Sequence, residues 1–148
     1  MKKKLKISLW VLLIFVVFAQ LKRIDKTNPE MKPEQTFSTV ENPPENVINL
    51  LHVACFDCHS NTTVYPWYSN VAPFSWWLSS HINHARTKMN LSEWGRLSKK
   101  ERGEKLEKMA KKIELGYMPI SSFKIMHVEA RLRDEDKKLL SNWLRSKL

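Results

Sequence analysis

Glycine is scarce in this chain, with only 3 in 148 positions. Glycine provides the positive backbone angles of tight hairpin turns and the bare backbone of phosphate-binding loops. Its scarcity argues against hairpin-rich β folds and against glycine-rich nucleotide sites. No stretch alternates apolar and polar residues as a half-buried strand does. The abundant Lys, Glu, Leu and Trp favour helices instead, so we expect an all-α fold.

Cysteine is nearly absent as well, and the only two are Cys55 and Cys58. Because there is no second pair, a four-cysteine zinc site is excluded. Two cysteines separated by two residues still allow a small disulfide, half of a metal site, or the attachment of a haem.

Acidic residues are missing from the first 24 positions, which carry six basic residues: Lys2, Lys3, Lys4, Lys6, Lys22 and Arg23. The rest of the chain has a net charge of only +4, so the total of +10 belongs largely to this segment. The charge therefore gives no reason to expect nucleic acid as a partner.

The segment 1–24 has the pattern of a membrane anchor or an export signal, because its basic start is followed by the apolar run 7–19. The run is short for a membrane-spanning helix, which needs about 20 residues. We expect an anchor, with Lys6 and Lys22 reaching the two interfaces and the body of the protein on the periplasmic side. The alternative is secretion to the periplasm after cleavage behind Ala19.

The remaining chain divides into a polar tether, 25–41, and a folded domain, 42–148. The tether contains two prolines and no apolar periodicity. In the domain, Asn42 is expected to cap the first helix, and Ser98 with Glu101 forms a capping box. Helices are expected over 43–55, 74–88, 99–115 and 134–147, separated by loops that include 61–73.

One short motif, Cys55-Phe56-Asp57-Cys58-His59, carries the chemistry of the chain as a C-x-x-C-H pattern. Two thiols three positions apart can reach the two vinyl groups of one porphyrin. A histidine directly after the second cysteine lies under the ring, where its imidazole can bind iron. The spacing predicts covalent attachment of one haem c through Cys55 and Cys58, with His59 as an iron ligand.

Two other interpretations of the motif stay open. A zinc site would use Cys55, Cys58 and His59 and would need one more ligand, such as His52 or His81. A redox-active or structural cysteine pair is the other possibility, but thioredoxin-like pairs normally follow a strand, and here a helix precedes the motif.

A second iron ligand is expected from the loop Tyr117-Met118-Pro119, which follows the helix-ending Gly116. The Met118 thioether can approach iron from the side opposite His59, and His/Met ligation raises the reduction potential. The competing candidates are His81, His84, Met126 and His127, of which His127 and His81 are the main alternatives.

With these residues in place, the domain resembles class I cytochromes c, which have a helix before the motif, a methionine ligand in a later loop, and an aromatic residue such as Trp143 on the last helix. More closely, it resembles the bacterial haem-binding domain family of short, membrane-tethered proteins. The residues that carry this resemblance are Asp57 to Asn61, Tyr65 to Ser69, Ser92 to Trp94, Met118 with Pro119, His127, Ala130 to Leu132, and Trp143. Its near lack of glycine departs from ordinary cytochromes c.

These features predict a one-electron carrier that works outside the cytoplasm with a redox partner protein of unknown identity. An enzyme is the less expected outcome. If Met118 does not bind iron, a peroxidase-like enzyme or a sensor of small gases is the alternative, with His127 or His81 as acid/base. The third hypothesis is a zinc-binding interaction module. A basic excess between positions 86 and 124 suits an acidic partner, but we favour the simpler explanation of a solvated helix face with Glu/Lys pairs.

Overall fold

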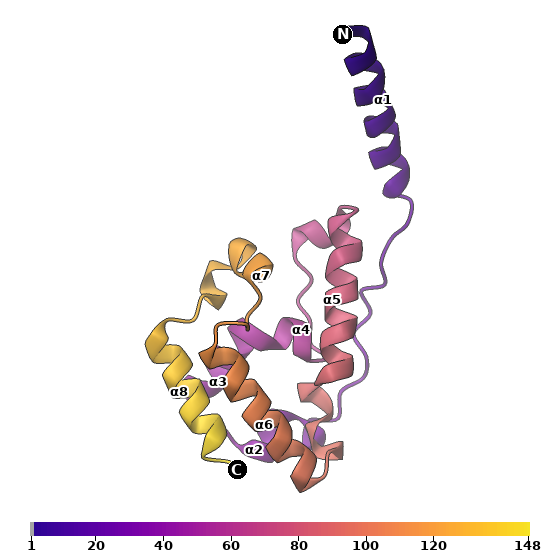
Figure 1. Cartoon of the computed structure of the whole chain (residues 1–148). Coiled ribbons are helices and arrows are strands. Elements are labelled where there is room, and N and C mark those ends of the chain that lie inside the picture. The colour runs from indigo at the N-terminus through magenta and orange to yellow at the C-terminus, as the bar shows by residue number, and fades with distance from the viewer. Residues whose placement is uncertain (1) are drawn as a thin grey trace.

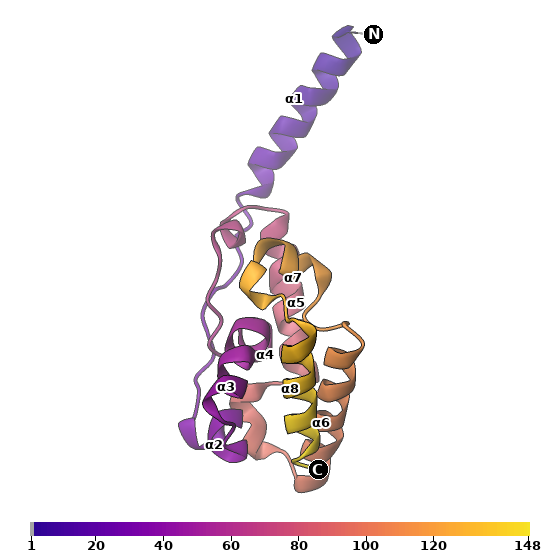
Figure 2. The same ribbon diagram turned by 90° about the vertical axis from the view of Figure 1, so that its left-hand side faces the viewer.

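The computed structural model describes residues 2–148, and every regular element in that range is a helix, which confirms the all-α expectation. A long N-terminal helix projects away from a compact helical body (Figures 1 and 2). The elements are α1 (Lys2–Ala19), η1 (Pro33–Gln35), α2 (Phe37–Glu41), α3 (Glu45–Leu51), η2 (His52–Phe56), α4 (Asp57–His59), η3 (Trp67–Asn70), α5 (Phe74–Lys88), η4 (Leu91–Arg96), α6 (Lys99–Glu114), α7 (Ser121–Met126), η5 (Val128–Ala130) and α8 (Asp134–Arg145).

Helix α1 exposes apolar side chains on all sides, from Leu5 to Phe18. Within the described residues 2–148, no helix combines the length and apolarity needed to cross a membrane. The transmembrane helix expected from the sequence is therefore not found. The reason is composition, since four of the 18 residues of α1 are lysines.

The segment after α1 is not a free tether. Residues 20–32, here called the strap, begin with a turn and then run along the body without regular structure (Figure 1). The Gln20 side chain exchanges two hydrogen bonds with the backbone of Ala72, at 3.1 and 2.9 Å, and Trp76 Nε1 donates to the Lys22 carbonyl at 2.9 Å. Further along, the Asn28 amide donates to the Thr63 carbonyl. These contacts fix the direction in which α1 leaves the domain.

The expected tether also contributes to the core through α2. Phe37 is fully buried and lies edge-to-face against Trp94, with ring centroids 4.9 Å apart. Trp94 Nε1 donates to the Glu41 carboxylate at 2.7 Å. The packing therefore extends upstream of position 42. Gly95 lets η1 lie close against η4, because a Cβ at position 95 would lie only 3.1 Å from Gln35 Cα.

The helix that carries the motif differs from the expected single helix. Asn42 does not cap it; Asn42 instead ends α2 in the left-handed conformation, with φ 46°, and Pro44 precedes α3. After Leu51 the chain continues as the π-helical turn η2 and then as α4. A π turn inserts an extra residue and so rotates the next turn of helix about its axis, and such turns are frequent at functional sites.

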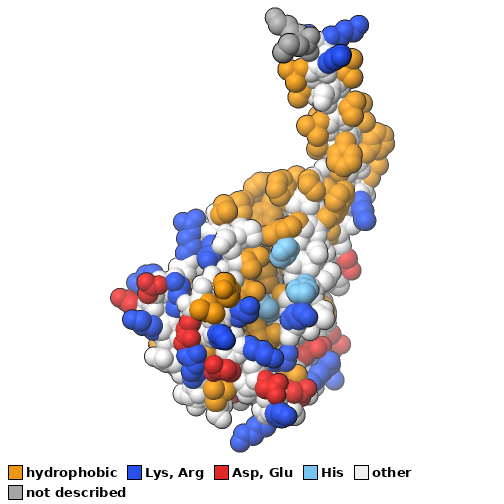
Figure 3. All heavy atoms as spheres, in the orientation of Figure 1, with side chains coloured by type: hydrophobic (Ala, Val, Ile, Leu, Met, Phe, Trp, Pro, Cys, Tyr) orange, Lys and Arg blue, Asp and Glu red, His pale blue; other side chains and the backbone are white. Residues whose placement is uncertain are grey.

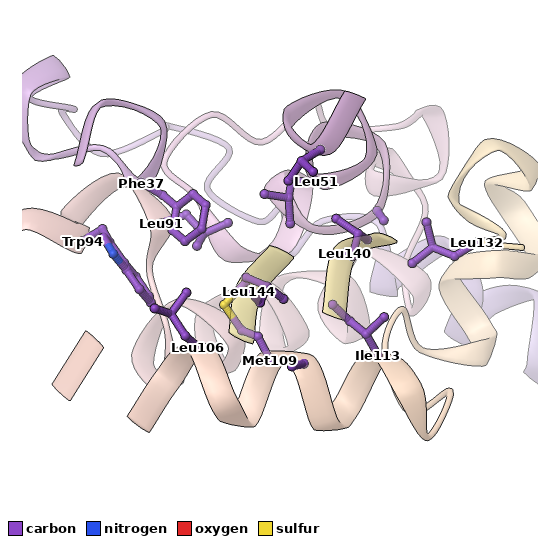
Figure 4. Close-up of a cluster of buried hydrophobic side chains, with 13 residues drawn as sticks. Phe37, Leu51, Leu91, Trp94, Leu106, Met109, Ile113, Leu132, Leu140 and Leu144 are labelled. Atoms are coloured by element: carbon purple, nitrogen blue, oxygen red, sulfur yellow. The ribbon is translucent and has the colours of Figure 1, made fainter. Parts of the chain in front are cut away.

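The other expected helices are confirmed. Helix α5 has the predicted bounds, and the capping box of Ser98 and Glu101 starts α6, with Gly116 in the left-handed conformation just after its end. Helix α8 lies beside α6 (Figure 2). In the main core, Leu106, Met109 and Ile113 of α6 point towards α8, where Leu140 and Leu144 are completely buried (Figure 4).

Candidate functional site

The C-x-x-C-H motif joins the two apolar clusters of the domain. Cys55 packs against the main core, whereas Cys58 packs against a smaller cluster of Tyr68, Leu78 and Ile82. Both thiols are free and half-buried. The end of η2 and the short α4 thus place two sulfur atoms between the α6–α8 side and the α5 side of the body.

Burial controls the ionisation of both cysteines. It raises the pKa of Cys55 to about 12, with a further contribution from nearby Cys58. It raises the pKa of Cys58 to about 11, where Asp57 adds to the effect and Arg86 opposes it. A redox-active cysteine pair needs a lowered thiol pKa. The environment therefore disfavours the thioredoxin-like interpretation.

His59 is held in one orientation by the end of α5. Its Nδ1 lies 3.0 Å from the Met89 carbonyl oxygen, which can only accept, so Nδ1 carries the proton. That carbonyl is free because α5 ends at Lys88 and Met89 is extended. The other nitrogen, Nε2, is thus left unprotonated. Burial lowers the pKa of His59, and the Met89 hydrogen bond opposes this effect only in part. The lowered pKa keeps the ring neutral.

These properties are those of a metal-binding imidazole. Iron needs a neutral ring with a free nitrogen, and a hydrogen bond from the other nitrogen to a carbonyl fixes the ring and its tautomer. With two cysteines just before it, His59 fits a covalently attached haem. The carbonyl partner, Met89, was not foreseen, because it lies 30 residues away along the chain.

Polar side chains hold the chain directly after the motif. Arg86 of α5 donates from Nε to the Ser60 carbonyl and from Nη2 to Thr63 Oγ1, each at 2.8 Å. Thr63 in turn donates to the Asp57 carbonyl at 2.6 Å. Sequence reasoning missed Arg86, which it treated as part of a basic stretch. No local pattern distinguishes it from the other cations of that stretch.

The candidates for the second iron ligand have different surroundings. Met118 follows α6 in a loop and is 37% exposed. His81 on α5 bonds through Nδ1 to the Trp77 carbonyl at 2.9 Å, which leaves Nε2 free, and His84 is exposed. His127 uses both ring nitrogens: Nε2 lies 3.0 Å from the Tyr68 hydroxyl, and Nδ1 lies 3.1 Å from the Glu129 carboxylate. His127 is thus the candidate least free to bind iron.

Tyr68, His127 and Glu129 form a hydrogen-bonded chain beside the motif. Tyr68 is buried next to Cys58, and burial raises its pKa, with a smaller effect from Cys58. The His127 ring is stacked on Phe123 at 4.1 Å. The chain therefore links η3 to the segment of α7 and η5 across the site, and it can hold or pass a proton.

The zinc interpretation finds no further ligand. Among the described residues, no three or more His, Cys, Asp and Glu side chains lie together as a metal site would require. His52, one of the proposed fourth ligands, is exposed, and its ring lies tilted against Phe56 with the ring centroids 4.0 Å apart. The residues at the motif fit haem better than zinc.

An apolar stripe with histidines along it runs between the two sides of the body (Figure 3). Large apolar side chains from several elements remain exposed, among them Val64, Trp67, Phe74, Trp77, Ile125 and Val128. An apolar cofactor needs walls of this kind.

Comparison with known proteins agrees with this chemistry. No curated protein and no solved structure matches the chain. The family model described as a haem-binding domain matches residues 14–146, which is nearly the whole chain. The chain therefore belongs to the haem-binding domain family.

Proposed function

We propose that the family's haem is held covalently in this protein, by thioether bonds to Cys55 and Cys58, with His59 Nε2 as an iron ligand. The observation that carries the proposal is the Met89 carbonyl bond, which leaves Nε2 free on a neutral ring. Both cysteines are free thiols next to it. Haem, when bound, supplies an iron that can exchange one electron.

We further propose electron transfer as the activity, with Met118 as the second iron ligand. Two filled ligand positions let the oxidation state change with little movement of the protein. The exposed apolar side chains of the body offer a contact for a redox partner protein. The class I cytochrome c likeness of the sequence agrees with this activity.

The state of the second ligand position is tested by carbon monoxide. The reduced full-length holoprotein is expected to give a low-spin spectrum that added CO does not change. In Met118→Ala, CO is expected to bind at once and shift the spectrum, because the position has opened. Met31→Ala is the matched control, since Met31 in the strap is a methionine of similar exposure and is not a candidate ligand.

Other results of this titration would change the assignment. If CO binds the unchanged protein readily, Met118 is not a ligand. If only His81→Ala opens the position, His81 is the second ligand, and its free Nε2 explains the choice.

The second candidate function is peroxidase-like catalysis or gas sensing at an open position. The chain of Tyr68, His127 and Glu129 favours it, because His127 can exchange a proton through Nε2 while Glu129 orients the ring. In that case His127→Gln is expected to slow peroxide consumption by about 100-fold. Stopped-flow absorption measures the rate, and His84→Gln, at an exposed histidine, is the control. An equal rate in the His127 variant would remove this candidate.

We propose a location outside the cytoplasm, since covalent haem is attached there. The basic and apolar segment 1–24 then serves to hold the protein at the membrane or to direct its secretion. The strap begins at Gln20, so its contacts with the domain would survive a cleavage behind Ala19.

A further inference from the structure

A cavity of about 100 Å³ lies between the strap and the start of α5, away from the cysteine motif. One water molecule needs about 10–15 Å³ of such space, so the cavity can hold several waters or one small ion. The wall residues that matter for its chemistry are Lys22, Arg23, Lys26, Ser69, Ala72 and Ser75.

The charge of the cavity is positive. Lys22, Arg23 and Lys26 line it, and no acidic side chain does. Asp25, in the same part of the strap, is exposed and accepts a hydrogen bond from the Thr27 backbone N–H. In the described part of the chain, none of the three cations forms an ion pair with a carboxylate.

The partners that these cations do have are uncharged. Arg23 and Lys26 contact the backbone and side-chain oxygens of Asn70, and the Lys22 ammonium lies 5.9 Å from the centre of the Trp76 ring. Neutral partners leave the positive field of the cavity in place. The strap contacts bring these cations to one spot, where three like charges repel one another unless an anion is present.

A buried hydroxyl without a partner points independently to a ligand. Ser69 in the cavity wall is 2% exposed, and its Oγ has no hydrogen-bond partner. It is the one buried side-chain polar atom in residues 2–148 left in this state. Buried polar groups are almost always paired, so an orphan of this kind calls for an explanation. The Oγ atom is closed to solvent, so the Ser69 side chain has to turn towards the cavity before an oxyanion there accepts this bond.

Helix α5 adds to the field, because it begins at Phe74 beside the cavity and is 15 residues long. The N–H groups of Ser75, Trp76 and Trp77 already bond to the Val71 and Pro73 carbonyls. The helix therefore contributes through its dipole and not through direct hydrogen bonds.

We propose that this cavity binds a tetrahedral oxyanion of the phosphate class. The anion could be free phosphate or the phosphate group of a lipid, because the cavity lies where the apolar α1 joins the body (Figure 1). The site would bind with Lys22 and Arg23 as its main charges and Ser69 as a hydrogen-bond donor.

Calorimetric titration of inorganic phosphate into the full-length holoprotein in neutral detergent tests the site, with chloride at matched ionic strength as the reference. Saturable binding is expected. The double variant Lys22→Gln/Arg23→Gln is expected to bind phosphate about tenfold more weakly, or weaker still, because charge-assisted bonds are lost. Lys99→Gln/Lys100→Gln removes the same charge at the start of α6 and should leave binding unchanged.

Ser69→Ala separates a ligand role from a structural one. Without a ligand, removal of an unpaired buried hydroxyl should leave the thermal stability unchanged or raise it. With a ligand, the same variant should bind phosphate several-fold more weakly while staying folded by circular dichroism. Phosphate binding that is equal in Ser69→Ala and the unchanged protein would remove Ser69 from the site.

Vesicles distinguish the two sources of the anion. Phosphatidylcholine vesicles with and without phosphatidylglycerol are mixed with the unchanged protein and with both double variants, which cancels the contribution of α1. If only the Lys22/Arg23 variant loses vesicle binding, the ligand is a lipid phosphate. Saturable binding of inorganic phosphate alone identifies the free ion. If neither probe distinguishes the Lys22/Arg23 variant from the Lys99/Lys100 control, the proposal is wrong.

Discussion

Replacement of both Cys55 and Cys58 with alanine is expected to abolish covalent retention of haem. In a host with c-type haem maturation, the unchanged chain should keep its haem after denaturation and solvent extraction. The double variant should lose all of it, because no thioether bond remains. The single variants each leave one bond and should retain haem at a lower yield. Absorption of the denatured, extracted chain measures the result.

A control within the motif makes this test specific. Phe56→Leu replaces a half-buried residue that lies between the two cysteines in the sequence. Both thiols and His59 stay in place, so covalent retention should persist. If the unchanged chain releases its haem on extraction, covalent attachment is wrong, and the family's haem is bound without thioether bonds. The two claims, haem binding and covalent attachment, are thus tested separately.

The substitution Phe37→Ala is expected to destabilise the domain by about 3–5 kcal/mol, as truncation of a fully buried aromatic residue does. Phe37 contacts two aromatic rings edge-to-face, Trp94 at 4.9 Å and Trp143 at 6.0 Å, so its loss leaves a cavity between η4 and α8. The melting temperature should fall by about 10–20 °C, measured by circular dichroism on the holoprotein.

Ser38→Ala is the control for this prediction, because Ser38 is on the same short helix, α2, and is not in the core. Its melting temperature should change by no more than about 2 °C, as for a surface substitution. A Phe37→Ala effect as small as that of Ser38→Ala would mean that 33–41 behaves as a tether in solution after all.

Local patterns in the sequence were sufficient for those features that depend on neighbouring residues. The bounds of α5, the capping box of Ser98 and Glu101, and the end of α6 near Gly116 follow from short-range propensities, because the groups involved are within a few residues of one another. The cysteine and histidine motif is local for the same reason. Its spacing alone predicted haem, and the family match supports haem binding by the chain.

Local patterns failed where a residue's role depends on a distant partner. Asn42 has the chemistry of a helix cap at either end, and packing of α2 decided that it ends that helix. The segment 25–41 is polar on average, and its few apolar residues, Met31, Phe37 and Val40, are too sparse to give a periodic signal. The expected transmembrane helix was not found because of the lysine content of α1, which the sequence already contained.

The sequence by itself thus determined the helical class, most helix bounds, and the residues able to hold haem. The tertiary structure alone decided the state of those residues: the Met89 carbonyl that sets the His59 tautomer, and the Tyr68 hydroxyl bound to His127 across 59 positions. It also decided that the strap lies along the domain. The physical reason is that hydrogen bonds and burial join groups far apart in the chain, and no local pattern of residues specifies which distant group each will meet.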